Sequence, residues 1–269
     1  MKTLVSRHDP IVGAFRELID TPDAAGRRLL LDGAHLVRDA AAAGLEFEVA
    51  AVSTAHLAGD TEQSALTEQL RRDGVEVLTV TEQVLGAMSP VRTPSGIVAI
   101  IRRPPAALAD ICQQREGLLL VIVDVQDPGN VGSLIRAAEA GGVTGVIVCG
   151  ASASPFGWKA LRGSMGSTLR LPVGTGVTVD AALTCLKAFN TRTIATAATG
   201  GHDPDAVDWT GRTALLLGGE GAGLTSEVIA ACDARVTIPM SPPVESLNVA
   251  AAGAVLIYAA RRQRAGAHT

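Results

Sequence analysis

The feature that most constrains the fold is a series of short apolar segments in the second half of the chain. The clearest is GLLLVIVDV at residues 117–125, and others lie at 144–150, 192–199, 213–219 and 234–240. Nearly continuous apolar runs of this length are typical of strands that are buried on both faces of a sheet. Because helical stretches separate these segments, we expect a mostly parallel sheet with helices on both sides, and thus an α/β fold.

The first hundred residues contain a second alternation of helix and strand. We expect four strands there, with helices between them, at residues 28–31, 46–53, 75–80 and 95–102. The run RRPPAALAD that follows contains two adjacent prolines, which disfavour both a helix and a sheet ladder. The sequence therefore predicts two α/β domains, residues 1–105 and 117–269, with a linker at 106–116.

The charge of the chain gives a mixed signal for nucleic-acid binding. The formal net charge of −4 argues mildly against it. However, nearly all of the 23 basic residues are arginines, which suit bidentate contacts with phosphate. Several arginines are close together in the sequence: Arg27 and Arg28, Arg71 and Arg72, Arg102 and Arg103, and Arg261, Arg262 and Arg264. Each of these groups is either a solvated surface feature or a contact for phosphate.

The cysteines and the apolar pattern argue against several classes of protein. Cys112, Cys149, Cys185 and Cys232 lie far apart, without a Cys-x-x-Cys motif or a histidine at metal-binding spacing. We therefore expect neither a metal site nor a disulfide framework, as suits a reducing cytoplasm. The N-terminal segment lacks the apolar core of a signal peptide, and we expect no membrane segment because no apolar run reaches roughly eighteen residues.

Three segments that follow predicted strands contain polar residues suited to chemistry. In the first, Asp127-Pro128-Gly129 forms a turn, and Asn130 precedes a helix that contains Arg136. Backbone N–H groups and an amide at a helix N-terminus suit an anion, with the arginine within reach of a phosphate. The alternative is an ordinary strand-turn-helix connection with a surface arginine.

The second segment is LLLGGEGAGL at residues 215–224. It lacks both the G-x-G-x-x-G order of a dinucleotide fold and the Lys-Ser/Thr pair of a P-loop. Its glycines would let the backbone approach a ligand closely. Glu220 lies among them, and a carboxylate there would repel phosphate but accept a cationic ligand such as a sulfonium. The alternative is a structural glycine turn.

The third segment contains IPM at 238–240 and ESLNV at 245–249, followed by a long alanine-rich helix. Ser246 or Asn248 could cap that helix, and capping is the simplest explanation for either residue. A cap alone does not require Ser, Leu and Asn together directly after an acidic Glu245.

Together the three segments resemble the signature motifs of the SpoU/TrmH family, the RNA ribose methyltransferases of the SPOUT superfamily. The matching patterns are D-P-x-N-x-G with a following Arg, L-G-x-E-x-x-G, and I-P-M with E-S-L-N-V, in that order. Agreement in all three motifs is highly specific. The first hundred residues, through LLLDGAHLVRDAAAAG and TPSGIVAI, are similar to the small substrate-binding domain of the family, which is like ribosomal protein L30e.

The resemblance implies a fold, a cofactor and a set of site residues. The fold is a C-terminal SPOUT domain with a trefoil knot, active as a homodimer in which residues of both chains meet at each site. S-adenosylmethionine would contact Gly218, Ile238 and Leu247. The catalytic and substrate-positioning places fall on Asn130, Arg136, Glu220, Ser246 and Asn248. The sequence departs from the usual motif at Gly219, where Ser or Ala is commoner, and at Pro242-Pro243.

The resemblance also implies the reaction, the methylation of a ribose 2′-hydroxyl in RNA. Arginine stays protonated in proteins, so we favour a phosphate contact for Arg136, although a role as the general base is also open. We expect 23S ribosomal RNA as the substrate, with transfer RNA as the alternative. Two other classes of protein are considered: an RNA-binding or ribosome-assembly protein without activity, and a nicotinamide-dependent oxidoreductase. The first would be expected to lack residues such as Arg136 and Glu220, and the second lacks its nucleotide fingerprint.

Overall fold

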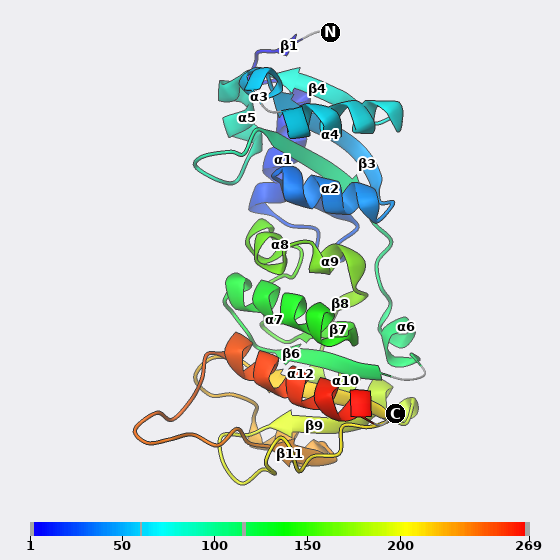
Figure 1. Ribbon diagram of the computed structural model, residues 1–269, viewed down its shortest axis with the longest axis vertical. Coiled ribbons are helices and arrows are strands. Elements are labelled where there is room, and N and C mark those ends of the chain that lie inside the picture. The colour runs from blue at the N-terminus through cyan, green and yellow to red at the C-terminus, as the bar shows by residue number, and fades with distance from the viewer. Residues whose placement is uncertain (1–2, 60, 115–116, 267–269) are drawn as a thin grey trace. The chain divides into compact units, whose positions relative to one another are not determined.

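The computed structural model describes residues 3–59, 61–114 and 117–266, and the chain divides into two compact units (Figure 1). The first unit comprises Met1–Pro105 together with Phe156–Arg170, and the second comprises Ala106–Pro155 and Leu171–Thr269. Residues 115 and 116 of the predicted linker lie outside the described residues. The domain limits drawn from the sequence stay a prediction. In the structure, the first unit also contains a second segment, Phe156–Arg170.

The second unit is built on six parallel strands. Their order across the sheet is β11-β9-β10-β6-β7-β8, and every neighbouring pair is parallel. The strands are β6 (Gly117–Val123), β7 (Val143–Cys149), β8 (Val173–Val177), β9 (Arg192–Thr196), β10 (Arg212–Gly218) and β11 (Ala234–Val236). The buried parallel sheet predicted from the apolar segments is thus confirmed.

Helices cover both faces of this sheet. Leu119, Val121 and Val123 belong to a buried cluster with the helices α6 (Leu108–Cys112), α10 (Val179–Ala188) and α11 (Ser226–Ala231). The helices α7 (Pro128–Gly141) and α12 (Val249–Gly266) pack side by side over the opposite face. Their contact is close because Gly253 has no side chain: a Cβ there would lie 2.4 Å from Cδ2 of Leu134.

The strand order creates a crevice at the carboxyl end of the sheet. β6 lies between β10 and β7, so the chain leaves β6 toward one side and later returns to its other side as β10. In open α/β sheets, ligands bind where neighbouring strands send their connections in different directions. Gly218 pairs with Val123 at the ends of β10 and β6, so the loops after these two strands begin side by side.

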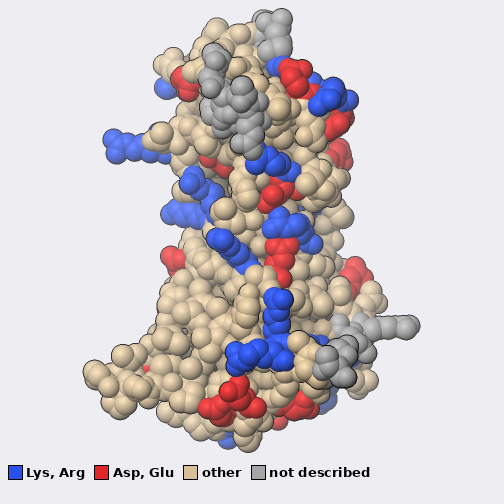
Figure 2. All heavy atoms as spheres, viewed as in Figure 1, with Lys and Arg blue, Asp and Glu red and all other residues tan. Residues whose placement is uncertain are grey.

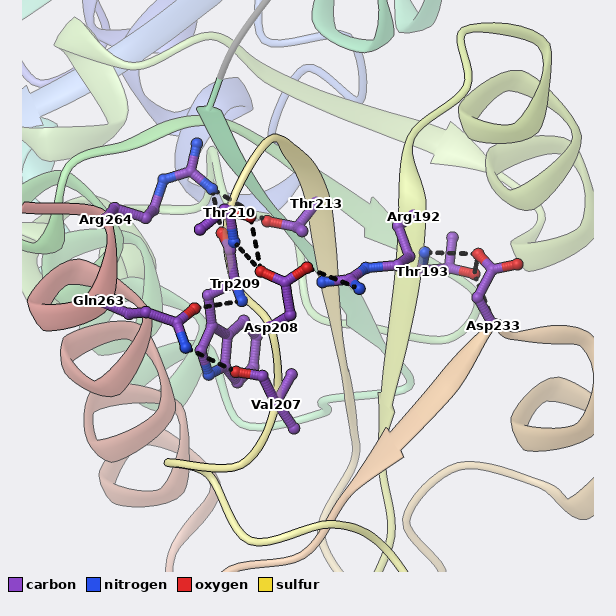
Figure 3. Close-up of polar contacts among 10 residues, drawn as sticks. All are labelled: Arg192, Thr193, Val207, Asp208, Trp209, Thr210, Thr213, Asp233, Gln263 and Arg264. Carbon is purple, nitrogen blue, oxygen red and sulfur yellow. Dashed lines mark hydrogen bonds and ion pairs between the residues drawn. The ribbon is translucent and has the colours of Figure 1, made fainter. Parts of the chain in front are cut away.

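The C-terminal end of α12 is fixed to the segment between β9 and β10 (Figure 3). Gln263 accepts a hydrogen bond from the backbone N–H of Trp209 at 2.5 Å and donates one to the carbonyl of Val207 at 3.0 Å. Arg264 donates to the carbonyl of Trp209. The indole ring of Trp209 is fully buried, and its N–H donates to the carbonyl of Pro204 at 2.8 Å.

The first unit contains a mixed sheet in the order β1-β4-β3-β5-β2, in which β5 is antiparallel to both of its neighbours. The strands are β1 (Thr3–Leu4), β2 (Arg28–Asp32), β3 (Glu46–Ser53), β4 (Val77–Val80) and β5 (Ile97–Arg102). The helices are α1 (Pro10–Asp20), α2 (Ala34–Ala42), α3 (Thr54–Gly59), α4 (Thr61–Arg72) and α5 (Glu82–Met88), with α8 (Trp158–Ser164) and α9 (Ser167–Arg170) from the second segment.

The second segment of the first unit is attached by both stacking and charge. The guanidinium of Arg103 lies 5.0 Å from the centre of the Phe156 ring and donates to the carbonyl of Thr168 at 3.2 Å. Arg170 forms an ion pair with Asp39 at 2.9 Å. Arg103 is buried, so removing either of its contacts would leave its desolvated charge with less compensation.

Most of the clustered arginines have partners within the chain. On the face drawn in Figure 2, basic and acidic side chains are intermixed in several places. The pairs include Arg28 and Arg102 with Glu48, Arg71 with Glu68, and Arg262 with Asp205. For these residues the surface interpretation is favoured over a phosphate contact.

Asp32, at the end of β2, gives the first unit a pH-dependent stability. Its side chain is 2% exposed, accepts a hydrogen bond from the Ser89 hydroxyl at 2.5 Å and lies 3.9 Å from Arg162. Burial raises the pKa of this carboxyl group, opposed by the Ser89 hydrogen bond and the Arg162 charge. The folded protein therefore binds this proton more tightly than the unfolded chain, and its stability falls as the pH rises above the unfolded pKa of about 4.

We expect Asp32→Asn to remove this loss, because the amide still accepts the Ser89 hydrogen bond but does not ionise. The free energy of unfolding of the variant should exceed that of the wild type at pH 7, and the difference should shrink toward pH 4. Urea unfolding across this range measures both curves, with Asp73→Asn as an exposed control in the same unit. If the free energy of unfolding depends on pH in the same way in Asp32→Asn and in the wild type, the prediction is wrong.

Candidate active site

A cavity of about 470 Å³ lies in the second unit, beside the crevice at the carboxyl end of the sheet. The segments after β9, β10 and β11 and the first turns of α12 line it. Six of the eight residues predicted for the site are among its lining: Gly218, Glu220, Ile238, Ser246, Leu247 and Asn248. Asn130, which is 90 positions from Glu220 in the chain, also reaches the site through a hydrogen bond to that residue.

The glycine segment after β10 forms a tight turn that no other residue type would allow. A Cβ on Gly218 would lie 2.3 Å from backbone atoms of Gly223 and Leu224. Gly221 and Gly223 have φ angles of +102° and +65°, in the region that favours glycine. The turn therefore brings bare backbone to the cavity wall, which suits a ligand held by main-chain groups.

Asn130, Glu220 and Asn248 form one hydrogen-bonded network. The side-chain amide of Asn130 donates to the Glu220 carboxylate at 2.5 Å, and its carbonyl oxygen accepts from the amide of Asn248 at 3.1 Å. The carboxylate and the second amide thus fix which way the Asn130 amide points. Three segments that are far apart in sequence meet in this network, beside the cavity.

The local structure around Asn130 and Asn248 follows from helix capping. Asp127 caps α7 by accepting a hydrogen bond from the backbone N–H of Asn130 at 2.8 Å. The Asn248 side chain accepts from the backbone N–H groups of Ala250 and Ala251, at 2.9 and 3.4 Å. Asn248 therefore both caps α12 and joins the network, so capping does not account for all of its contacts.

Arg136 lies outside this group. It is exposed on α7, six residues after Asn130, and does not line the cavity. With 3.6 residues per turn, this spacing directs the two side chains to different sides of the helix. Within the described residues, its guanidinium has no hydrogen-bond or ion-pair partner.

Sequence reasoning missed several lining residues, among them Thr196, Ala197 and Ala198 directly after β9. The available signal was the end of an apolar strand at the same edge of the sheet. The Thr196 hydroxyl donates to the carbonyl of Leu216 at 3.0 Å, which ties β9 to β10 beside the cavity.

Two of the cysteine thiols are buried in the described part of the chain. Burial raises the pKa of the Cys149 thiol to about 12, and that of Cys112 to about 12. Among the described residues, no three His, Cys, Asp or Glu side chains are grouped as a metal site. In the same residues, no helix has the length and apolar character needed to cross a membrane.

Comparison with known proteins identifies the class of protein that this fold and site define. Residues 117–258 match the SpoU rRNA Methylase family, and residues 24–99 match the MRM3-like substrate binding domain. The 23S rRNA (guanosine(2553)-2′-O)-methyltransferase RlmP of Bacillus subtilis is 30% identical over 230 residues, covering 85% of this chain and 86% of that protein. The 23S rRNA (guanosine-2′-O-)-methyltransferase RlmB of Xanthomonas campestris is 33% identical over 214 residues, covering 75% and 84%.

A solved structure is similar over nearly the whole chain. The crystal structure of an AdoMet-bound rRNA methyltransferase from Sinorhizobium meliloti has a TM-score of 0.85 and 28% identity, and the alignment covers 97% of each chain. The chain therefore belongs to the SpoU rRNA methylase family. It is an RNA 2′-O-methyltransferase that uses S-adenosylmethionine, which confirms the family, reaction and cofactor predicted from the motifs and excludes the oxidoreductase. The trefoil knot stays a prediction.

The double role of Asn248 can be separated by substitution. Asn248→Asp keeps the capping oxygen but cannot donate to Asn130, and it adds a negative charge near Glu220. Asn248→Ala loses both functions. We expect Ala to lower the free energy of unfolding by about 1 kcal/mol and Asp to leave it nearly unchanged, because Asn and Asp cap helices about equally well.

Methyl transfer should fall in both Asn248 variants. Urea unfolding and single-turnover rates at saturating S-adenosylmethionine measure the two effects, with Thr225→Asp as a cap-preserving control at α11. A wild-type rate in Asn248→Asp would show that its donated hydrogen bond has no role in the reaction.

Proposed function

We propose that this enzyme methylates a ribose 2′-hydroxyl of 23S ribosomal RNA at the cavity described above. The meeting of Asn130, Glu220 and Asn248 beside the glycine turn is the observation that carries the assignment of the site. The named 23S rRNA substrates of RlmP and RlmB support the choice of RNA. Transfer RNA is the alternative substrate. A ribosomal substrate also favours a cytoplasmic location, where ribosomes are assembled.

The cavity residues fit S-adenosylmethionine, which supplies an electrophilic methyl group when bound. Gly218, Ile238 and Leu247 would hold it through backbone and apolar contacts. The carboxylate of Glu220 suits a positively charged ligand. Because the four glycines of the turn have no side chains, the ligand can approach their main chain closely.

The remaining residues would orient the attacking hydroxyl. In the reaction, the ribose oxygen would bond to the methyl carbon as its bond to sulfur breaks, and the hydroxyl proton would pass to water or to a phosphate oxygen of the RNA. Asn130 and Ser246 can hydrogen-bond to the ribose, while Glu220 and Asn248 hold Asn130 in one orientation. Holding reacting atoms in line is the main contribution that such a site can make.

Arg136 would contact the phosphate beside the target ribose and stabilise the negative charge that develops on its oxygen. The alternative is that Arg136 is itself the general base. Because Arg136 does not line the cavity of its own chain, we propose that it reaches the cavity of a partner subunit in a homodimer.

An exposed apolar surface supports such a dimer through the second unit. Val255 and Tyr258, one turn apart on α12, are 44% and 43% exposed. Val244 and Leu247, in the segment before α12, are also exposed. Figure 2 shows few charges at the lower left, where this segment projects in Figure 1. Large apolar side chains that are exposed to this extent on one unit are typical of a contact with another protein chain.

Arg136→Ala should separate cofactor binding from chemistry. We expect the affinity for S-adenosylmethionine to stay nearly unchanged while methyl transfer falls by about 10²-fold or more, as for loss of one preorganised electrostatic group. Arg136→Lys should recover only part of the rate, since a point charge replaces a planar fork. Calorimetric titration and single-turnover rates measure the two quantities. Wild-type methyl transfer by Arg136→Ala would mean that this arginine is a surface residue.

A heterodimer tests whether Arg136 acts on the partner subunit. Arg136→Ala and Gly218→Ala, each inactive alone, would be co-expressed with different tags and purified as a mixed dimer. If Arg136 acts across the dimer, one site of the mixed dimer has both an intact cavity and an intact arginine, and activity returns. If it acts within its own chain, both sites stay defective. A monomer by sedimentation at micromolar concentration would contradict the dimer itself.

The RNA substrate can be identified by mapping ribose methylation in total RNA from cells with and without the gene. We expect one methylated ribose of 23S ribosomal RNA to disappear and to return when the wild-type enzyme is supplied. Supply of Arg136→Ala serves as the control and should not restore it. Loss of a position in transfer RNA would support the alternative substrate, and no lost position in either RNA would contradict both.

A further inference from the structure

Asp124, directly after β6, has an unusual backbone conformation. Its φ angle is +55°, in the left-handed region that residues other than glycine rarely adopt. Within the described residues, only Met165 and Asn190 share this property among the non-glycine residues. Such conformations persist when surrounding contacts hold them, and they are concentrated at functional sites.

The carbonyl group of Asp124 lies against the glycine turn of the cavity. A Cβ on Gly219 would lie 2.0 Å from the carbonyl oxygen of Asp124, too close for any side chain. Gly219 is also the position at which this sequence departs from the Ser or Ala common in the motif. The departure therefore has a structural reason in this chain, because it makes room for the Asp124 carbonyl.

The side chain of Asp124 holds the loop after β7. Its Oδ1 atom accepts a hydrogen bond from the backbone N–H of Ala151 at 2.7 Å. A Cβ on Gly150 would lie 2.2 Å from the same oxygen, so Gly150 is required for this approach. One residue thus contacts the loops after β7 and β10, while its own backbone begins the loop after β6.

These contacts hold the two loops that contain Glu220 and Asn130. Glu220 follows Gly219 directly, and Asn130 follows Asp124 by six residues, through the cap at Asp127. The hydrogen bond of 2.5 Å between Asn130 and Glu220 therefore joins two loops that are also in contact at Asp124 and Gly219. A shift of either loop would change the orientation of the Asn130 amide.

We propose that Asp124 is a positioning residue for methyl transfer, which holds the Asn130 loop and the Glu220 turn in the register needed for their hydrogen bond. It acts through its left-handed backbone and through its hydrogen bond to Ala151, and not through its charge. This inference rests on the proposed roles of Asn130 and Glu220.

Three substitutions separate the left-handed backbone of Asp124 from its side-chain hydrogen bond. Asp124→Asn keeps an acceptor oxygen and tolerates the left-handed conformation, Asp124→Gly keeps only the conformation, and Asp124→Ala keeps neither. We expect near-wild-type methyl transfer for Asn, a lower rate for Gly, and a fall of about 10-fold or more for Ala, in line with a small misplacement of reacting groups. The affinity for S-adenosylmethionine should change less than the rate in all three.

The matched control is Asn190→Ala. Asn190 also has a left-handed backbone, with a φ of +54°, but lies before β9 and does not line the cavity. Its variant should lower the thermal midpoint while leaving the rate per folded molecule unchanged. Single-turnover rates on RNA, calorimetric titration of S-adenosylmethionine and thermal unfolding supply the three readouts for all variants.

A fourth readout does not depend on RNA or on activity. The side-chain amide of Asn130, observed by NMR in protein labelled with ¹⁵N-asparagine, should shift in Asp124→Gly and Asp124→Ala but not in Asn190→Ala. If the wild-type enzyme does not methylate ribosomal RNA but the Asn130 resonance shifts as expected in the Asp124 variants, the RNA assignment is wrong and the positioning of Asn130 by Asp124 is supported. The inference is overturned if Asp124→Asn is as slow as Asp124→Ala, or if the Asn130 resonance is unchanged in Asp124→Gly. If Asp124→Ala does not fold, the Asn and Gly variants still decide.

Discussion

The register between β6 and β10 is the constraint on which the active site depends. Gly218 and Val123 are paired at the ends of these strands, so Asp124 and Gly219 begin their loops side by side. Because parallel strands end at the same edge, the polar residues of both loops meet there, and α12 brings Asn248 to the same edge. Fixing α12 at both ends, by the Asn248 cap and by Gln263, keeps that third element in place.

The strands of the second unit could largely be predicted from sequence because continuous apolar runs have few other uses. β8, with the sequence VGTGV, was missed because its two glycines interrupt the apolar pattern. The start of α1 has a readable signal in the sequence, since Asp9 is the cap and Pro10 lies in the first turn. Strand order was beyond the sequence, since it depends on contacts between residues far apart in the chain.

For the active site too, the sequence identifies individual residues but not the contacts between distant segments. The motifs contain Asn130, Glu220 and Asn248, but only the fold shows that one amide bridges the other two groups. The linker prediction rested on Pro104 and Pro105, whereas α6 directly after them packs into the core, because Ile111 and Cys112 are apolar and buried. The spacing of six residues places Arg136 and Asn130 on different sides of one helix, but only the fold shows which side faces the cavity.

The first unit is made of two pieces of chain, and this has a consequence for the evolution and engineering of the enzyme. Phe156–Arg170 belongs with Met1–Pro105, although it is encoded in the middle of the methyltransferase sequence. A gene fusion that exchanges only the first hundred residues would therefore leave Arg170 and Phe156 facing a foreign surface. Recombination that transfers the first unit intact, in nature or in the laboratory, therefore has to carry both segments.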